Sequence, residues 1–328
     1  MEITTKKQIS LALNEYLQVI YQRDGSTQTD FWKQHDLNDG YVSSVKNGKV
    51  EGKYPADTFY IELANIIGFQ IEKTYWKHID TTLYKSIVKT ADIARQQKKL
   101  IGIDGNTGSG KSHAVEKITK ERPGTTALVV ADATLYVTKA THNFIQQIYF
   151  ACGYKEEMKI SDMRKKIFDK AKNTPNFLLI FDETEYLNKQ CWDIIKGIYR
   201  ELDGQCGFLV CGLGIQKYVE SRAASKWGGR GWQQIASRMK PNWNILPEMG
   251  AGVHGWNIEC KRVLQEVSKS FTNDAFGWFA SNCQDYRDIM HYASEILLVA
   301  DEQKWTKINS SILDEYFFNQ SNSNPYSE

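Results

Sequence analysis

The stretch Gly105-Asn106-Thr107-Gly108-Ser109-Gly110-Lys111-Ser112 decides the fold of this chain. It follows the apolar run of residues 100–103 and precedes a helix-like segment at residues 114–118, so it reads as strand, glycine-rich loop and helix. The G-x-x-x-x-G-K-S pattern in this setting is typical of a phosphate-binding loop, because glycines let many backbone N–H groups converge on one triphosphate. A helix that starts near Lys111 adds its dipole and its free N–H groups.

The residue types of this loop predict which atoms contact a nucleotide. We expect residues 105–110 to surround the phosphates and Lys111 to reach the β- and γ-phosphates. The Ser112 hydroxyl is expected to bind Mg²⁺. His113 follows the loop directly and is a further candidate for nucleotide contact, with simple packing as the alternative. ATP and Mg²⁺ are therefore the expected cofactors.

The bulk composition describes a globular protein without a strong charge bias. The chain has 328 residues, 41% of them hydrophobic, and a net charge of +2, which allows two or three domains and leaves any nucleic-acid contact to local patches. Six cysteines without C-x-x-C spacing are expected to be buried thiols in a reducing compartment. The sequence shows no signal-peptide pattern and no apolar run of membrane-spanning length, so we expect a cytoplasmic protein without a membrane partner.

Two adjacent acids, Asp182 and Glu183, end the apolar run of residues 177–181 about seventy residues after the loop. The carboxyl ends of parallel strands face the ligand, so both acids are expected beside the Mg²⁺. Asp182 would hold the metal, and Glu183 would orient and deprotonate the attacking water. The alternative, a strand that ends in exposed acids, is disfavoured by the phosphate-binding loop.

Residues 99–248 alternate between short apolar runs and amphipathic segments, which predicts an α/β fold with a parallel sheet covered by helices on both faces. The expected strands are residues 100–103, 127–130, 177–181, 208–211 and 243–246. The expected helices lie near residues 112–121, 141–152, 159–172, 188–203 and 215–239, the last interrupted by two glycines.

The flanking regions are expected to be helical. Residues 1–70 contain several short helical segments and resemble a lambda-repressor-like helix-turn-helix, with a second helix from Thr27 and a recognition helix over residues 39–46. Residues 71–98 are expected to form a helical connector, residues 249–318 a C-terminal helical lid and residues 319–328 a disordered tail. The recognition helix would offer Ser43, Ser44 and Lys46 to DNA, but residues 1–60 hold seven basic against eight acidic residues, which leaves a packing or protein-docking module open.

A family resemblance follows from the segment after Asp182-Glu183. Thr184-Glu185-Tyr186-Leu187 and the helix after it resemble the AAA+ branch of the phosphate-loop ATPases. The later segments Leu209–Ile215 and Gln233–Met239 resemble those of DNA-transposition members, the Mu B-type and TnsC-type target-selector ATPases. Their order of domains, a small repressor-like domain, an ATPase core and C-terminal helices, is similar too.

The resemblance implies roles for two arginines. Arg238 would be an arginine finger that reaches the γ-phosphate of a neighbouring subunit, with Arg230 as second choice and a solvated helix end as the alternative. Arg287 would be a sensor-2 residue that contacts phosphate in its own chain, with a structural ion pair as the alternative. One departure from the family is that Cys211-Gly212-Leu213 stands where a polar sensor is expected.

The resemblance implies one surface for DNA, and the basic composition of a later stretch suggests a second. The loop and helix after the second strand offer Thr138, Lys139 and Thr141 to DNA phosphates, although an ordinary helix start would look the same. The basic stretch of residues 214–241 could bind DNA, but a subunit interface is the better explanation for it.

These features together predict an ATPase that oligomerises on double-stranded DNA as a filament or ring and recruits a transposase. The alternatives are an ATP-switched transcriptional or signalling regulator and a loader of the replication-helicase type. The sequence specifies neither the number of subunits nor the partner, the target preference or the hydrolysis rate.

Overall fold

The computed structural model describes residues 3–50, 52, 55–69, 75–132, 139–225 and 229–318. The chain divides into two compact units, Met1–Thr74 and Tyr75–Glu328. Three of the expected features lie outside the described residues: Thr138, the side chain of Arg230, and the tail over residues 319–328.

The N-terminal unit contains four helices, α1 (Ile3–Asp24), α2 (Gln28–Gln34), α3 (Asp39–Lys46) and α4 (Asp57–Ile66). Their starts are specified locally, because Thr27 and Asp30 form a capping box at α2 and the Asn38 side chain accepts a hydrogen bond from Tyr41 N at α3. All four helices contribute to one apolar cluster, in which Leu13 is fully buried. Helices α2 and α3 thus lie where the sequence predicts them.

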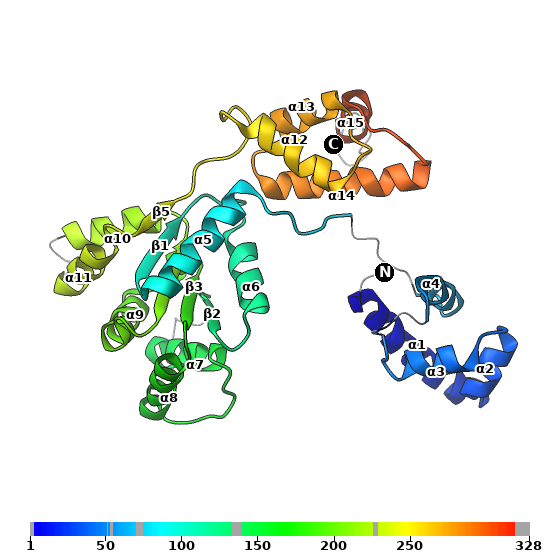
Figure 1. Ribbon diagram of the computed structural model, residues 1–328, viewed down its shortest axis with the longest axis horizontal. Coiled ribbons are helices and arrows are strands. Elements are labelled where there is room, and N and C mark those ends of the chain that lie inside the picture. Colours follow the sequence, from blue (N-terminus) through cyan, green and yellow to red (C-terminus); the bar gives the residue numbers. More distant parts are fainter. Residues whose placement is uncertain are drawn as a thin grey trace, which may run out of the picture. The chain divides into compact units, whose positions relative to one another are not determined.

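The second unit is built on a five-stranded parallel sheet in the order β2-β3-β4-β1-β5 (Figure 1). The strands are β1 (Leu100–Asp104), β2 (Thr126–Val130), β3 (Leu178–Asp182), β4 (Gly207–Gly212) and β5 (Trp243–Ile245). The predicted α/β fold with a parallel sheet is confirmed.

Helices cover both faces of this sheet (Figure 1). The alternation along β3 shows how: Leu178 and Ile180 belong to the cluster that contains α5 (Thr82–Gln97) and α6 (Lys111–Glu121), while Leu179 and Phe181 belong to the opposite cluster. The opposite face is covered by α7 (Ala140–Ala151), α8 (Ile160–Asn173), α9 (Lys189–Leu202), α10 (Ile215–Ala224) and α11 (Gly229–Met239). The loop between β1 and α6 follows the carboxyl end of β1.

The C-terminal region adds four helices, α12 (Trp256–Val267), α13 (Asn273–Asn282), α14 (Tyr286–Gln303) and α15 (Ser310–Phe317). Their buried side chains share one cluster with α5, α6 and the sheet. These C-terminal helices are therefore packed on the same hydrophobic core as the strands, and they approach the loop after β1 through the start of α14.

The connector is helical over only part of its predicted range. Helix α5 begins at Thr82, and residues 75–81 are not helical, so the prediction of a helix throughout residues 71–98 is wrong for that segment. The physical reason is a helix start at Thr81, whose extended backbone and side chain, which accepts a hydrogen bond from Tyr84 N at 3.1 Å, form an N-cap.

All six cysteines lie in the described ranges and are buried free thiols, as the spacing predicts. Among the described helices, none combines the length and the apolar character that a membrane span requires.

Candidate functional site

The loop between β1 and α6 has the backbone of an anion-binding turn. Gly108 and Gly110 have φ values of 73° and 82°, in the left-handed region that glycine adopts without strain. Gly110 is the N-cap of α6, and no side chain caps this helix. The N-terminal N–H groups of an eleven-residue helix are therefore directed into the loop.

Lys111 folds back over this loop. Its ammonium donates hydrogen bonds to Gly105 O at 2.6 Å, to Asn106 O at 2.9 Å and to Ser109 Oγ at 3.3 Å. Burial lowers the pKa of Lys111, and the carboxylates of Glu185 and Asp182 oppose that shift. A cation is thus held where a nucleotide phosphate would lie against the loop.

Asp182 ends β3 and is 1% exposed. Burial raises the pKa of its carboxyl, while a hydrogen bond from the Ser112 side chain opposes the shift. Its Oδ1 atom has no hydrogen-bond partner among the described residues. A buried carboxylate oxygen without a partner beside a serine hydroxyl fits Mg²⁺, which prefers oxygen ligands and is often held by only one or two protein groups together with phosphates and water.

Glu183 has a left-handed backbone, with a φ of 54°, which is uncommon for a residue with a side chain. It leads into the short 3₁₀ helix η2 (Thr184–Tyr186). Burial and the neighbouring carboxylates of Asp182 and Glu185 raise its pKa. A half-buried carboxylate with a raised pKa is suited to accept a proton from water.

Glu185 was not predicted as a site residue, yet its side chain lies at the end of β4. Gly212, the last residue of β4, has no room for a Cβ, because Glu185 Oε2, Ile215 Cγ2 and Thr184 Oγ1 fill the space. Thr184 Oγ1 also donates a hydrogen bond to Cys211 O at 2.9 Å. A carboxylate from η2 therefore lies beside the last residue of β4.

These residues line one cavity of about 340 Å³. The loop from Thr107 to His113 forms one wall, and the acids Asp182, Glu183 and Glu185 form another. Gly212 and Leu213 at the end of β4 also line the cavity. The rest of the lining is mostly aromatic and apolar and comes from residues 75–81, α5 and α14: Trp76, Ile79, Thr81, Tyr84, Tyr286, Arg287 and Met290. A polar end for phosphates and an apolar region for a base are thus present in the same cavity.

The start of α14 contacts the phosphate-binding loop. Asp285 caps α14 by accepting hydrogen bonds from the N–H groups of Arg287 and Asp288. Its carboxylate also lies against Gly108, where it leaves no space for a Cβ. Arg287 lines the cavity, so the structure brings this predicted residue to the loop.

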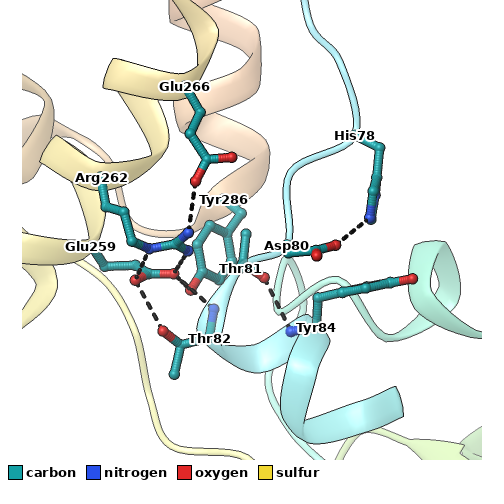
Figure 2. Close-up of polar contacts among 9 residues, drawn as sticks. All are labelled: His78, Asp80, Thr81, Thr82, Tyr84, Glu259, Arg262, Glu266 and Tyr286. Atoms are coloured by element: carbon teal, nitrogen blue, oxygen red, sulfur yellow. Dashed lines mark hydrogen bonds and ion pairs between the residues drawn. The ribbon is translucent and has the colours of Figure 1, made fainter.

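His113 lies in the cavity wall and packs against the connector. Its Nε2 lies 2.9 Å from His78 Nδ1, and the other ring nitrogen of His78 lies 2.9 Å from Asp80 Oδ1 (Figure 2 shows the His78–Asp80 contact). Burial and His78 lower the pKa of His113. Both expectations for this residue, nucleotide contact and packing, are compatible with its position.

Arg238 lies outside the cavity of its own chain. Its guanidinium is 5.1 Å from the centroid of the Tyr199 ring. It lines a separate open hollow with Gln233, Gln234 and Ser237. A role at the γ-phosphate would therefore require a second subunit.

Two of the residues expected to contact DNA border another open hollow. Lys139 and Thr141 at the start of α7 line it together with Asn188, Lys189 and Gln190 at the start of α9. In the N-terminal unit, Ser43, Ser44 and Lys46 lie on α3, where Lys46 Nζ donates a hydrogen bond to Gln28 Oε1 at 2.8 Å.

Comparison with solved structures gives low similarities. Cdc6p from Pyrobaculum aerophilum is 11% identical with a TM-score of 0.46, over 69% of this chain and 62% of that chain. The Aeropyrum pernix Orc1 protein in complex with DNA is 10% identical with a TM-score of 0.49, over 72% and 65%. Drosophila ORC bound to DNA is 11% identical with a TM-score of 0.45, over 73% and 60%. This chain therefore spans less than two thirds of the length of each.

No curated protein matches the sequence. A family model does: the KAP family P-loop domain matches residues 76–239, which is half of the chain. The matched region begins in the connector and contains the phosphate-binding loop, Asp182, Glu183 and Arg238. The chain belongs to the KAP family of P-loop NTPases.

Proposed function

We propose that this chain is an ATPase that hydrolyses ATP to ADP and phosphate in the presence of Mg²⁺. The observation that supports this most is the convergence of Lys111, Ser112, Asp182 and Glu183 on one cavity. The loop and Lys111 bind the β- and γ-phosphates, and Ser112 and Asp182 hold the metal. Mg²⁺, when bound, supplies positive charge that offsets the charge of the phosphates.

Glu183 and Glu185 have different roles at the attacking water. Glu183 accepts a proton from water while the water oxygen attacks the γ-phosphorus, and the bond to the bridging oxygen breaks to release ADP. Glu185, whose carboxylate fills the space beside Gly212, orients the water from the end of β4. Arg287 contacts phosphate within the chain.

We further propose that the chain acts as an AAA+ ATPase of the Mu B/TnsC type. In this proposal it oligomerises on double-stranded DNA with little sequence preference and recruits a transposase. Arg238 supports it, because an arginine outside its own cavity can complete the site of a neighbouring subunit. Hydrolysis at such a shared site would couple turnover to disassembly.

The DNA surface of this proposal is the hollow bordered by α7 and α9. Both helices are long enough to have a marked dipole, and both begin at this hollow next to Lys139 and Lys189. Lysines, hydroxyls and helix starts bind phosphates without reading sequence. The N-terminal unit contributes either DNA contacts through α3, in a helix-turn-helix, or a protein-docking surface.

A gel-shift assay on random-sequence duplex DNA tests this function. We expect the full chain to bind DNA with ATP or a non-hydrolysable analogue and to bind weakly with ADP or without nucleotide. Lys111→Ala should lose the nucleotide-dependent binding. Equal binding under all conditions would count against the proposal.

The second candidate is an ATP-switched regulator. It is supported by α3, which carries the residues expected to contact DNA. Binding to one specific DNA sequence that depends on Ser43, Ser44 and Lys46 would favour that function. Association with a replicative helicase, without a response from a transposase, would favour the helicase-loader alternative.

A further inference from the structure

Glu259 on α12 is a buried carboxylate at the junction of three elements (Figure 2). It is 7% exposed and accepts five hydrogen bonds. Thr82 donates from its N–H at 2.9 Å and from its hydroxyl at 3.0 Å. Arg262 donates from Nη2 at 2.8 Å and from Nε at 3.1 Å, and the Tyr286 hydroxyl donates at 2.8 Å.

The donors outside α12 belong to the starts of two other helices. Thr82 is the first residue of α5, and its N–H has no acceptor within the helix, so Glu259 completes the cap that Thr81 begins. Tyr286 is the first residue of α14. Thr81 and Tyr286 both line the nucleotide cavity, so Glu259 lies directly behind two parts of its wall.

The position of Tyr286 matters because both of its neighbours face the phosphate-binding loop. Asp285 lies against Gly108, and Arg287 lines the cavity. Tyr286 is the middle residue of these three, and its ring packs edge-on against Trp256 at 5.4 Å. The bond from its hydroxyl to Glu259 therefore fixes the segment of α14 that meets the loop.

The contacts differ from an ordinary surface ion pair. The Glu259–Arg262 pair is largely buried on the carboxylate side, with 9% of the Glu259 side chain exposed. Removing the charged acceptor would leave the buried hydroxyl of Tyr286 and the partly buried donors of Thr82 without a full partner, which costs more than the loss of an exposed pair. The Glu259 carboxylate thus links the start of α5 to α12 and α14 through hydrogen bonds.

We propose that Glu259 is a positioning residue for the nucleotide, which acts by holding the start of α14 and the start of α5 together around the apolar part of the cavity. The proposal rests on the ATPase function proposed above. Glu259 itself does not line the cavity, so it acts through Tyr286 and Thr82. Its effect falls on nucleotide affinity, because Thr82 and Tyr286 belong to α5 and α14 and not to the segment after β3 that carries the acids.

The test compares Glu259→Gln with Glu266→Gln in the full chain. Glu266 lies on the same helix and binds Arg262 at 3.0 Å, but its side chain is 51% exposed, which makes it a matched control. We expect Glu259→Gln to raise the Kd for a non-hydrolysable ATP analogue with Mg²⁺, and the KM for ATP, by about tenfold. The kcat should change by less than about twofold, because the reacting atoms are untouched. Glu266→Gln should behave as wild type.

A second variant separates positioning from folding. Tyr286→Phe keeps the ring in the cavity wall and removes only the hydroxyl that binds Glu259. Because Glu259 also binds Thr82, the double variant should lose no more affinity than Glu259→Gln alone if Tyr286 acts through its contact with Glu259. Additive losses, or a lower melting temperature with unchanged Kd and KM, would overturn the proposal.

The experiment also separates this inference from the function on which it rests. If the wild-type chain binds no ATP, the proposed function fails and the inference fails with it. If the wild-type chain binds ATP and both Glu259→Gln and Tyr286→Phe bind it equally well, only the positioning role is lost.

Discussion

At the scale of single residues, the acids after β3 distinguish this site from a simple phosphate-binding loop. Glu183 follows the buried Asp182, while the Glu185 carboxylate lies beside Gly212, the last residue of β4. Burial raises the pKa of Glu183, and the neighbouring carboxylates of Asp182 and Glu185 raise it further. A raised pKa makes Glu183 a better proton acceptor than an ordinary carboxylate.

We predict different kinetic results for the two glutamates. Glu183→Gln should keep ATP binding and assembly but abolish turnover, because the amide cannot accept the proton. Glu185→Gln should retain a hydrogen-bonding group at Gly212 and lower kcat by only about tenfold, with little change in Kd. Steady-state ATPase and nucleotide-binding assays check both. Full activity of Glu183→Gln would refute the assignment of the base.

A second prediction concerns the pH dependence of stability. Burial opposes ionisation of Glu259, but hydrogen bonds from Arg262, Thr82 and Tyr286 outweigh it and lower its pKa from 4.5 to about 2. A group with a lowered pKa in the folded state stabilises the protein above its unfolded pKa, and this contribution is lost as the pH falls from 4.5 towards 2. The contribution at neutral pH is about 3 kcal/mol.

Urea unfolding of wild type and Glu259→Gln between pH 7 and pH 3 measures this contribution. The difference in free energy of unfolding between the two proteins should be largest at pH 7 and should shrink below pH 4.5. A difference that stays constant over this range would show that the charge of Glu259 is not the source of the stability.

At the scale of elements, the sequence predicted secondary structure best where one hydrophobic pattern continues over a whole helix or strand. The five strands lie within two residues of their predicted ends, because buried parallel strands are continuous apolar runs between helices. The start of α5 was misplaced, since the amphipathic pattern continues through residues 75–81 although Thr81 caps the helix. The N-cap at Thr81, and not the apolar periodicity, determines where α5 begins.

The candidate site was predictable to the extent that it is contiguous in sequence. The loop residues, Asp182 and Glu183 belong to two short motifs, and the structure brings them together. Glu185, Glu259 and Trp76 were not assigned to the site, because their proximity to it depends on how η2, α12 and the connector pack. The sequence alone does not reveal that the Glu185 carboxylate lies beside Gly212, because the two residues are far apart in the chain and meet only in the folded structure.

Helix α11 carries a prediction about assembly. Arg238 packs over Tyr199, just as Arg222 of α10 packs over Tyr218 at 5.3 Å. Arg238→Ala should reduce ATP hydrolysis by about 100-fold or more, since a finger supplied in trans has effects of that size or larger. The same change at Arg222 should have little effect. ATP binding should remain in both variants.

Mixing variants separates a finger from a structural arginine. Subunits with Glu183→Gln keep their arginine, and subunits with Arg238→Ala keep their base. If Arg238 acts on a neighbouring subunit, a mixture of the two inactive proteins should regain part of the ATPase activity. No recovery at any ratio would favour a purely structural contact with Tyr199.

At the scale of the whole molecule, the proposed DNA surface and the nucleotide cavity lie on different parts of the second unit. Lys139 and Lys189 border the hollow between α7 and α9. Replacing both by alanine should weaken ATP-dependent DNA binding for every sequence and reduce the salt dependence of log K by about two. ATP affinity without DNA should be unchanged.

The matched control for this variant is Lys46→Ala in the N-terminal unit. If α3 reads DNA, this change should alter sequence preference rather than the general salt dependence. Unchanged DNA binding by the Lys139→Ala, Lys189→Ala variant, measured by fluorescence anisotropy over a range of salt concentrations, would exclude the hollow as the contact surface.

The burial of all six cysteines has a practical consequence for observing the enzyme at work. Burial raises the pKa of every one of these thiols, to about 12 for Cys152, Cys191, Cys206 and Cys260 and in the same direction for Cys211 and Cys283. The six buried thiols of the folded protein are therefore expected to react little with a maleimide dye. A cysteine introduced at an exposed position such as Leu298, which is 46% exposed on α14, can then carry a fluorophore on an otherwise unaltered background. Such a label would report whether the surroundings of α14 change when ATP is added.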